Sequence, residues 1–396
     1  MDIAKLNQLI KPSGTMAISN KSRELLAEGK PVIQFAAGEP DFPTPDYVID
    51  AVKRAAENPK NHKYSPAAGL ESLRKEISNS ALLYSEYNVD PNNIVVTNGG
   101  KQAILTALFS ILNRDDEVLI PTPYWTTYPE AVKIVGGKPV FVNTQRENNF
   151  KVTIEELDKF ITSNTKLLIW CSPSNPTGVV YSKQESENIY NWVIKNNIWI
   201  LSDELYEHLV YEGKTSPSPA LYDKVMNNTI IVNGVSKAYS MTGWRVGWII
   251  SNEKVINLAK KIQSQGTSNV ANITQLAAEE ALKKGLDFTN KMKVAFNRRR
   301  LKAIQLIESI PNLSLLNGTG AFYLFVDVSY YCDGNFKNLT SSEEFCNWLL
   351  EEYYIAFVPG EVFGTSGFMR LSYALSDSEL EDGLGRLKEA IKQLNG

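Results

Sequence analysis

The sequence predicts an α/β protein, with a large domain built on a mainly parallel seven-stranded sheet and a smaller α+β domain after it. From about residue 46 to 290, short apolar runs alternate with amphipathic helical patterns, which is the order typical of a parallel sheet. From residue 291 one long charged helix and mixed elements replace this alternation. The chain has 396 residues, more than the roughly 250 to 300 at which single cores stop growing, so two domains are expected.

Seven apolar runs predict the strands of the large domain, and the segments between them predict helices. The helices are clearest at 101–112 and 182–197, where apolar residues recur three and four positions apart. The expected strands are NIVVT (93–97), EVLIP (117–121), KPVFV (138–142), KLLIW (166–170), IWILSDE (198–204), TIIVN (229–233) and RVGWII (245–250).

The two ends of the chain carry different patterns. Residues 1–45, which contain scattered glycines and three prolines between positions 40 and 45, predict an irregular arm that joins the small domain. The large domain is then expected at 46–290 and the small domain at 291–396, which opens with a helix from Lys291 to Ile310. Ser376 and Glu379 have the spacing of a capping box at the start of the last helix.

Composition excludes several classes of function. The formal charge of −3 and the lack of a long basic run argue against a nucleic-acid partner, and no apolar stretch approaches the roughly 20 residues of a membrane span. Three widely spaced cysteines without a CxxC pair suggest neither a disulfide framework nor a zinc site, and favour a cytoplasmic protein. With two histidines and no HExxH, GxSxG, Walker A or GxGxxG motif, no metal, hydrolase or nucleotide site is expected.

Three motifs resemble one family of enzymes. SKAYSMTGWRVGW contains Lys237, SPSNPTG lies upstream and FMRLSYA lies downstream. Taken singly, these motifs are not specific for a function, because most lysines are solvated and SPSNPTG has the composition of a turn. In this order, and from KPSGT at Lys11 to the last helix, they resemble class I pyridoxal-phosphate (PLP) aminotransferases of fold type I, and within these the bacterial aspartate aminotransferase branch.

The resemblance implies PLP as the cofactor and assigns three catalytic residues. Lys237 would bind the cofactor covalently and later carry the proton from the substrate's α-carbon. Asp203, at the end of a predicted strand, would pair with the ring nitrogen and keep the cofactor an effective electron sink. Tyr206 and Asn175 would hydrogen-bond the cofactor's phenolic oxygen.

The cofactor's phosphate requires free backbone N–H groups and a positive charge. A strand, the Gly99-Gly100 turn and a helix beginning near Lys101 predict a helix N-terminus that can face an anion. By resemblance, Ser236 and Arg245 would complete the phosphate cup. One departure stands out, because Gly234 occupies the position where relatives often have a phosphate-binding serine, so Ser236 is expected to compensate.

The resemblance assigns further residues to the ring and to the partner subunit. Trp125 would stack on the cofactor ring, and cis peptide bonds are expected before Pro123 and Pro176. Tyr64 would reach the cofactor of a neighbouring subunit, which implies a homodimer with shared sites.

The substrate's α-carboxylate is assigned to Arg370, whose planar fork suits bidentate binding, and Gly38 would lie beside the substrate because it has no side chain. For a second carboxylate, the stretch 263–272, where other branches place a partner-subunit arginine, contains no arginine or lysine. Lys101 and Lys11 occupy the positions that the bacterial branch uses instead, although either could be merely solvated. The predicted activity is aspartate aminotransferase, with amino acids and 2-oxo acids as small-molecule partners. Aspartate/prephenate aminotransferase, aromatic aminotransferase and a PLP lyase of the same fold are the alternatives.

Overall fold

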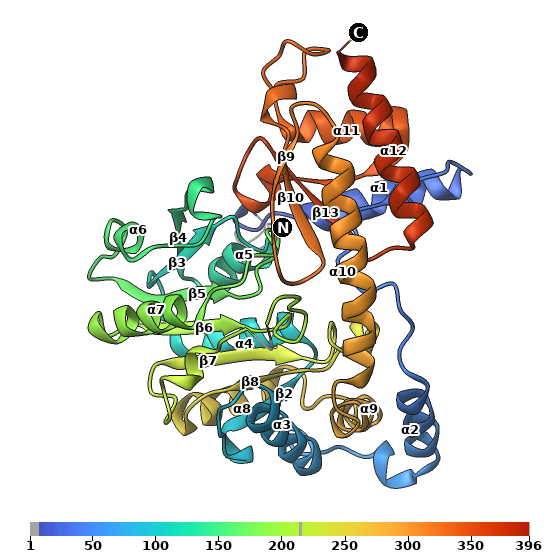
Figure 1. The fold of residues 1–396 in the computed structure, drawn as a ribbon. Helices are drawn as coiled ribbons and strands as arrows, with labels where there is room; N and C mark the ends of the chain where they lie inside the picture. The colour runs from blue at the N-terminus through green and yellow to red at the C-terminus, as the bar shows by residue number, and fades with distance from the viewer. Residues whose placement is uncertain (1–7, 214–215, 396) are drawn as a thin grey trace, which may run out of the picture.

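The computed structural model describes residues 8–213 and 216–395 of the chain, and its centre is a seven-stranded sheet in the order β2-β8-β7-β6-β5-β3-β4 (Figure 1). Every neighbouring pair in this sheet is parallel except the two pairs that include β8. The prediction of a mainly parallel seven-stranded sheet is therefore confirmed. Its strands are β2 (Ile94–Thr97), β3 (Glu117–Thr122), β4 (Lys138–Asn143), β5 (Thr165–Cys171), β6 (Trp199–Asp203), β7 (Thr229–Gly234) and β8 (Gly247–Ile250).

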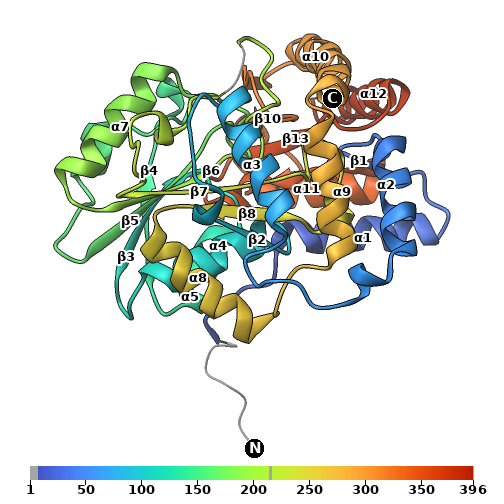
Figure 2. The ribbon, with the colours of Figure 1, turned by 90° about the horizontal axis from the view of Figure 1, so that it is seen from below.

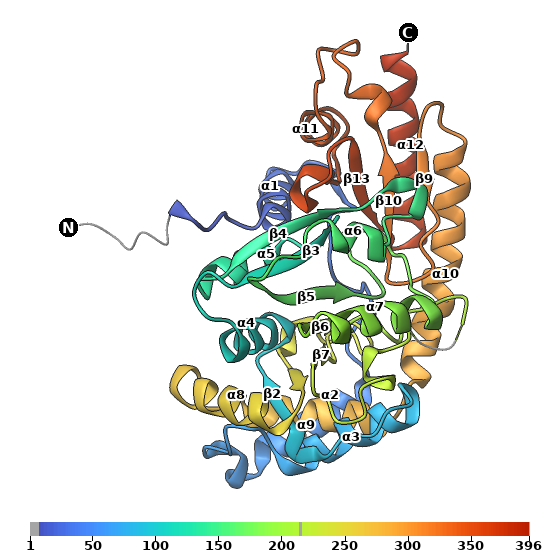
Figure 3. The ribbon, with the colours of Figure 1, turned by 90° about the vertical axis from the view of Figure 1, so that its left-hand side faces the viewer.

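Helices cover both faces of this sheet, because successive residues of its strands point in opposite directions. On one face, Val118 and Ile120 pack in a cluster with apolar residues of α4, α5 and α8, while Leu119 packs on the other face with residues of α6 and α7. Figure 3 shows α4 and α8 on the side of the sheet opposite α7. The helices that flank the sheet are α2 (Asp46–Glu57), α3 (Glu71–Tyr84), α4 (Gly100–Ile111), α5 (Thr127–Ile134), α6 (Ile154–Asp158), α7 (Lys183–Lys195), α8 (Glu253–Gly266) and α9 (Asn272–Lys283).

The C-terminal part of the chain forms a smaller sheet in the order β12-β13-β10-β9, with antiparallel pairing throughout. The long helix α10 (Asp287–Glu308) begins four residues before the predicted Lys291, and the capping box of Ser376 and Glu379 at the start of α12 is confirmed. The remaining elements are β9 (Ser314–Leu316), β10 (Tyr323–Asp327), α11 (Ser342–Tyr353), β11 (Ile355–Ala356), β12 (Val358–Pro359), β13 (Phe368–Ser372) and α12 (Asp377–Leu394).

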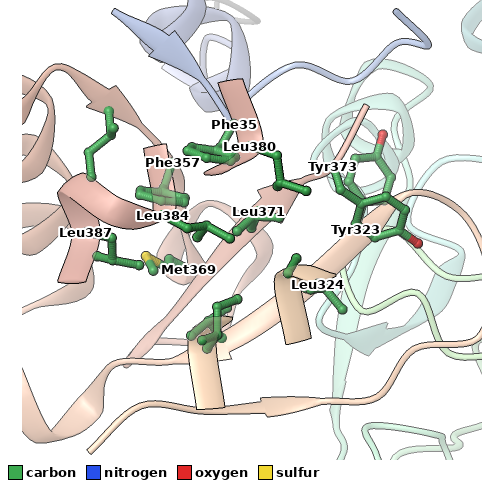
Figure 4. Packing of buried hydrophobic residues seen from close by; sticks show 14 of the residues in the cluster. Phe35, Tyr323, Leu324, Phe357, Met369, Leu371, Tyr373, Leu380, Leu384 and Leu387 are labelled. Carbon is green, nitrogen blue, oxygen red and sulfur yellow. The ribbon is translucent and has the colours of Figure 1, made fainter. Parts of the chain in front are cut away.

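One apolar core joins this smaller sheet to its helices and to the start of the chain. Phe35 stacks on Phe357 with ring centroids 4.8 Å apart, and Leu380 and Leu384 of α12 belong to the same buried cluster (Figure 4). Strand β1 (Ile33–Gln34) pairs in parallel with β11, so the N-terminal segment is part of this layer.

The prediction of an irregular N-terminal arm is wrong for residues 14–27, which form helix α1 (Gly14–Ala27). Half of its residues are polar, and only its Ile18 and Leu25 join an apolar cluster, so the sequence carries little helical periodicity. The helix is held by tertiary packing against β11 and β12, and Figure 2 shows it running beside the smaller part of the molecule.

Two kinds of feature are absent from residues 8–213 and 216–395, the described part of the chain. None of their helices combines the length and apolar character needed to cross a lipid bilayer. No three of their His, Cys, Asp and Glu side chains gather in a way that could hold a metal ion.

Candidate active site

A cavity of about 570 Å³ lies where the large sheet meets the smaller one. Asp203 enters it from the end of β6, Lys237 from the loop after β7, and Arg370 from β13 of the smaller sheet. Ligands in open parallel sheets bind at the carboxyl ends of the strands, which is where the first two residues lie. The sequence-predicted residues that line the cavity are Gly38, Gly100, Lys101, Trp125, Asn175, Asp203, Tyr206, Ser236, Lys237, Arg245 and Arg370.

The amine of Lys237 is held at the centre of this wall. Its Nζ donates a 2.6 Å hydrogen bond to the carbonyl of Gly38 and lies 5.9 Å from the centroid of the Tyr206 ring. Burial lowers the pKa of this amine to about 8, while the carboxylate of Glu39 opposes the shift and Arg370 reinforces it. A lysine with a lowered pKa supplies more neutral, nucleophilic amine near neutral pH than an exposed lysine.

Asp203 is buried below the cavity with 3% of its surface exposed. Its Oδ2 accepts a 2.7 Å hydrogen bond from the Tyr128 hydroxyl, and its Oδ1 accepts a 3.3 Å bond from the backbone N–H of Leu205. Burial raises the pKa of Asp203, and these two hydrogen bonds lower it again. The carboxylate is thus oriented by its neighbours and is suited to pair with a cationic ring nitrogen.

Arg370 is 2% exposed, and no carboxylate of the described residues lies within ion-pair distance of it. Its Nη1 donates to Oδ1 of Asn175 and its Nη2 to the carbonyl of Ala36, both at 2.9 Å, and its Nε is buried without a hydrogen-bond partner. The guanidinium lies 4.4 Å from the centroid of the Tyr323 ring. A buried cation held only by neutral groups and an aromatic face is stabilised by an anion, so this guanidinium is suited to bind a carboxylate.

Tyr206 is also held in place by the smaller sheet. Its hydroxyl lies 2.8 Å from that of Tyr323 on β10, and both rings are buried. Burial and the neighbouring phenol raise the pKa of Tyr206 well above 10, so it is a neutral hydrogen-bond donor. This contact couples the two sheets at the cavity wall.

The start of α4 forms a tight cradle in which two glycines lie close to the side chains of Arg245 and Leu205. Gly99 has φ of +80°, and a Cβ there would lie 2.4 Å from Nη2 of Arg245; a Cβ on Gly100 would lie 2.6 Å from the Leu205 side chain. Gly99 caps the helix without a side-chain hydrogen bond, so the first N–H groups remain available for an anion. Arg245 itself is anchored by a 2.8 Å bond from Nη1 to the carbonyl of Thr242.

The two predicted cis peptide bonds are confirmed, at Thr122-Pro123 and Asn175-Pro176. A third one, at Ser172-Pro173, was not predicted. Trp125 follows the first of them and lines the cavity, with the Lys101 ammonium 5.2 Å from its ring centroid.

Three predicted residues do not line the cavity of this single chain. Gly99 lies directly behind it; Tyr64 is 90% exposed; and Lys11 is exposed, with its backbone N–H bonded to Glu130. The roles given to these residues remain predictions.

Sequence reasoning also missed several residues of the wall. Tyr128 has a weak signal, since it lies in the first turn of α5, three positions after Trp125, but its bond to Asp203 joins residues 75 positions apart. Tyr323 and Arg23 carry no local signal, because one looks like any apolar strand residue and the other like a solvated arginine. The further residues that were missed are Ser13, Thr15, Met16, Ser19, Gln34, Ala36, Ala37, Glu39, Cys171, Leu205 and Thr242.

An amine with a lowered pKa, a buried carboxylate and a buried arginine without an ion-pair partner surround one cavity, a combination that is typical of enzyme sites. A family model described as aminotransferase class I and II matches residues 30–387 of the chain. The aspartate aminotransferase of Streptomyces avermitilis is 43% identical over 387 residues, covering 97% of this chain and 95% of its own length. A probable aspartate/prephenate aminotransferase of Aquifex aeolicus is 42% identical over 388 residues, with 97% of each chain covered.

A solved structure agrees with these relatives. The aspartate aminotransferase of Thermus thermophilus with maleate has a TM-score of 0.93 and 35% identity, covering 98% of this chain and 99% of its own. The chain therefore belongs to the class I and II aminotransferase family, whose members use pyridoxal phosphate.

The residues present fit that cofactor. Lys237 offers an amine, Asp203 a buried carboxylate, and the cradle at Gly99 and Gly100 a place for a phosphate that a Cβ would fill. The Nε of Arg370 in the same cavity is buried without a hydrogen-bond partner, which fits a site that binds a carboxylate. The cofactor supplies the electron sink for the α-carbon when it is bound.

Proposed function

We propose that this protein is an aspartate aminotransferase, which moves the amino group of L-aspartate to 2-oxoglutarate and gives oxaloacetate and L-glutamate. The observation that carries the proposal is the buried, carboxylate-free guanidinium of Arg370 in the same cavity as Lys237 and Asp203. The relatives named aspartate aminotransferase, which match almost the whole chain, support the choice of aspartate, and the maleate of the Thermus structure is itself a dicarboxylate.

In this proposal Arg370, Lys237 and Asp203 have separate tasks. Arg370 and Asn175 hold the α-carboxylate, with Gly38 beside the substrate, and this fixes the α-carbon near Nζ of Lys237. Lys237 binds the cofactor through its amine and then takes up and returns the α-proton, for which its pKa of about 8 is well suited. Asp203 carries the negative charge that pairs with the ring nitrogen.

The other predicted residues hold the cofactor. Tyr206 and Asn175 donate hydrogen bonds to its phenolic oxygen, and Trp125 covers its ring. The phosphate is bound by the start of α4, with Gly99 and Gly100 close to it and with Ser236, Lys101 and Arg245 around it.

The test of this proposal is a direct assay of the purified protein. Borohydride reduction of the protein incubated with PLP should attach the cofactor to Lys237, and aspartate with 2-oxoglutarate should give oxaloacetate and glutamate in equal amounts. A lyase would instead release ammonia without needing a 2-oxo acid. Ammonia release, or a failure to attach cofactor at Lys237, would rule the proposal out.

The identity of the 2-oxo acid that accepts the amino group leaves one specific alternative to the proposed activity. The Aquifex relative is named a probable aspartate/prephenate aminotransferase, and Lys11, in KPSGT, is the predicted residue that favours prephenate. An assay of aspartate with prephenate in place of 2-oxoglutarate tests the prephenate aminotransferase activity. An assay with aromatic 2-oxo acids tests the aromatic aminotransferase activity. Lys101→Ala tests the predicted contact of that lysine with the substrate. The substitution should lower kcat/KM for aspartate more than for alanine.

The proposal extends to the assembly and its location. The 90% exposed ring of Tyr64 fits a residue that completes the site of a second subunit, so we propose a homodimer, testable by sedimentation. The odd number of widely spaced cysteines supports a cytoplasmic protein. We also propose the division into an arm (1–45), a large domain (46–290) and a small domain (291–396).

A further inference from the structure

Tyr323 of the smaller sheet contacts several residues of the candidate site. It lies on β10 in the apolar core of that sheet, and its side chain is fully buried (Figure 4). Its hydroxyl lies 2.8 Å from that of Tyr206, and its ring centroid lies 4.4 Å from the guanidinium of Arg370. A Cβ on Gly38, whose carbonyl holds the Lys237 amine, would lie 3.6 Å from the Tyr323 hydroxyl oxygen. One side chain therefore lies between the tyrosine of the large domain and the buried arginine.

The pairing of β10 with β13 explains the contact with Arg370. Phe325 lies opposite Arg370 in this antiparallel pair, and Tyr323 lies two positions from Phe325 on the same face of the sheet. Diagonal neighbours of this kind are within reach of aromatic and long side chains. Tyr323 is itself paired with Ser372, so the backbone fixes its position. The smaller sheet thus presents the arginine and the tyrosine to the cavity as one unit.

The two hydroxyls fit one order of donation when Tyr206 serves the cofactor. A phenol has one proton to donate. Since Tyr206 donates that proton to the cofactor's phenolic oxygen in the proposed function, its own oxygen is left to accept a bond from Tyr323. Among the described residues, 8–213 and 216–395, neither hydroxyl has another hydrogen-bond partner. Tyr323 is thus the residue that orients the Tyr206 hydroxyl.

The charge of Arg370 supports the same order. Burial raises the pKa of Tyr323, and the guanidinium beside its ring opposes this rise. A cation that makes a hydroxyl more acidic also makes it a better donor, and hydrogen bonds in a chain polarise one another. Donation from Tyr323 to Tyr206 is therefore favoured, and it strengthens the bond that Tyr206 donates in turn.

We propose that Tyr323 is a positioning residue, which donates a hydrogen bond to Tyr206 and so directs the Tyr206 hydroxyl at the phenolic oxygen of the cofactor. Because Tyr323 acts through Tyr206, its role rests on the proposed function and deepens it. The smaller sheet then contributes to the binding of the cofactor as well as to that of the substrate's carboxylate.

The first test is Tyr323→Phe, which removes the hydroxyl and keeps the ring beside Arg370. We expect the dissociation constant of PLP, measured from absorbance, to rise by about 3- to 10-fold, the size expected for one hydrogen bond. The pH midpoint of the absorbance change of bound PLP should move upward. A weaker donor at the phenolic oxygen disfavours the form in which that oxygen carries more negative charge.

A double-mutant cycle shows whether Tyr323 acts through Tyr206. Tyr206→Phe alone should weaken PLP binding, because it removes the hydroxyl that contacts the cofactor. Adding Tyr323→Phe to this variant should weaken PLP binding no further and should leave the pH midpoint where Tyr206→Phe puts it. A further loss of the same size as in the single variant would show that Tyr323 acts by another route, and would overturn the inference.

Tyr331→Phe is the matched control, because Tyr331 is buried in the same apolar cluster but its hydroxyl donates to the carbonyl of Pro311 at 2.9 Å. It should leave the affinity for PLP and the pH midpoint unchanged, even where it lowers the melting temperature. If Tyr206→Phe weakens PLP binding and Tyr323→Phe does not, the inference is wrong while the role of Tyr206 stands. If the wild type does not bind PLP at Lys237, the proposed function itself fails.

Discussion

The hydroxyl of Tyr128 donates a 2.7 Å hydrogen bond to Oδ2 of Asp203, and both side chains are buried. The carboxylate that would face the cofactor ring is therefore oriented by a residue that need not touch the cofactor's reacting atoms. A hydrogen bond to the ionised form favours that form, so it opposes the rise in pKa that burial imposes on Asp203.

Tyr128→Phe should weaken cofactor binding and slow the reaction. Without the phenol, Asp203 is less well oriented and less readily ionised, and we expect kcat to fall by about tenfold, as for the loss of about one hydrogen bond to a charged group. The dissociation constant of PLP, measured from absorbance, should rise in parallel. Tyr124→Phe is the control, since Tyr124 stacks on Phe141 and is not bonded to Asp203. Equal PLP affinity in Tyr128→Phe and the wild type would refute the role given to Tyr128.

Arg370→Lys should lower activity toward every amino acid, unlike Lys101→Ala. The lysine loses the planar fork that contacts Asn175 and Ala36 at the same time, and it also loses the orphaned Nε. We expect kcat/KM to fall by at least about 100-fold for both aspartate and alanine, consistent with losing bidentate charged hydrogen bonds. The melting temperature should be measured alongside, and a loss confined to dicarboxylic substrates would contradict the assignment of Arg370 to the α-carboxylate.

Gly99→Ala should weaken binding of the cofactor's phosphate. The new methyl group would meet Nη2 of Arg245 at 2.4 Å, and the φ of +80° is unfavourable for alanine. The affinity for PLP should therefore fall, while the affinity for pyridoxal, which lacks the phosphate, should change much less. Gly385→Ala serves as the control, because a Cβ there meets nothing within 4 Å. An equal loss for PLP and pyridoxal would mean that the substitution distorts the whole site.

The sequence predicted the architecture well because the strands of the large sheet are uniform apolar runs with clear turns between them. Strand β7, for example, was expected at 229–233 and runs from Thr229 to Gly234. Helix α1 was not predicted, because only two of its apolar residues, Ile18 and Leu25, pack in a cluster, its one buried residue is the polar Ser22, and its stability comes from packing against distant strands. The local sequence pattern thus located the elements that bury a full apolar face. It did not locate helix α1, which depends on tertiary contacts.

The residues of the candidate site also fall into those that the sequence predicted and those that it did not. Lys237, Asp203 and Arg370 were found because each lies in a motif that resembles a family, and each lines one cavity. Tyr128 and Tyr323 were not found, because their partners Asp203 and Tyr206 lie far away in the sequence and a lone tyrosine has no distinguishing neighbours. The residues that orient other residues of the cavity wall are therefore those that required the three-dimensional structure.

The last prediction concerns stability and a second buried carboxylate, Glu204, next to Asp203. Glu204 is 2% exposed, and its Oε1 accepts hydrogen bonds from Ser202 and Ser218 while its Oε2 has no partner. Burial, followed by the charge of Glu207, raises the pKa of Glu204 to about 8. Between its ordinary pKa of 4.5 and about 8 the folded protein therefore binds more protons at this group than the unfolded chain does.

Because the folded state holds the extra proton, this group makes the free energy of unfolding fall as pH rises from about 4.5 to 8. Glu204→Gln keeps the shape and the acceptor for Ser202 and Ser218 but cannot ionise. We expect the variant to be at least as stable as the wild type at pH 8 and to lose less stability between pH 5 and 8, as measured by urea unfolding. Glu57→Gln, at an exposed position, should follow the wild type, and an unchanged slope in Glu204→Gln would show that Glu204 does not titrate in this range.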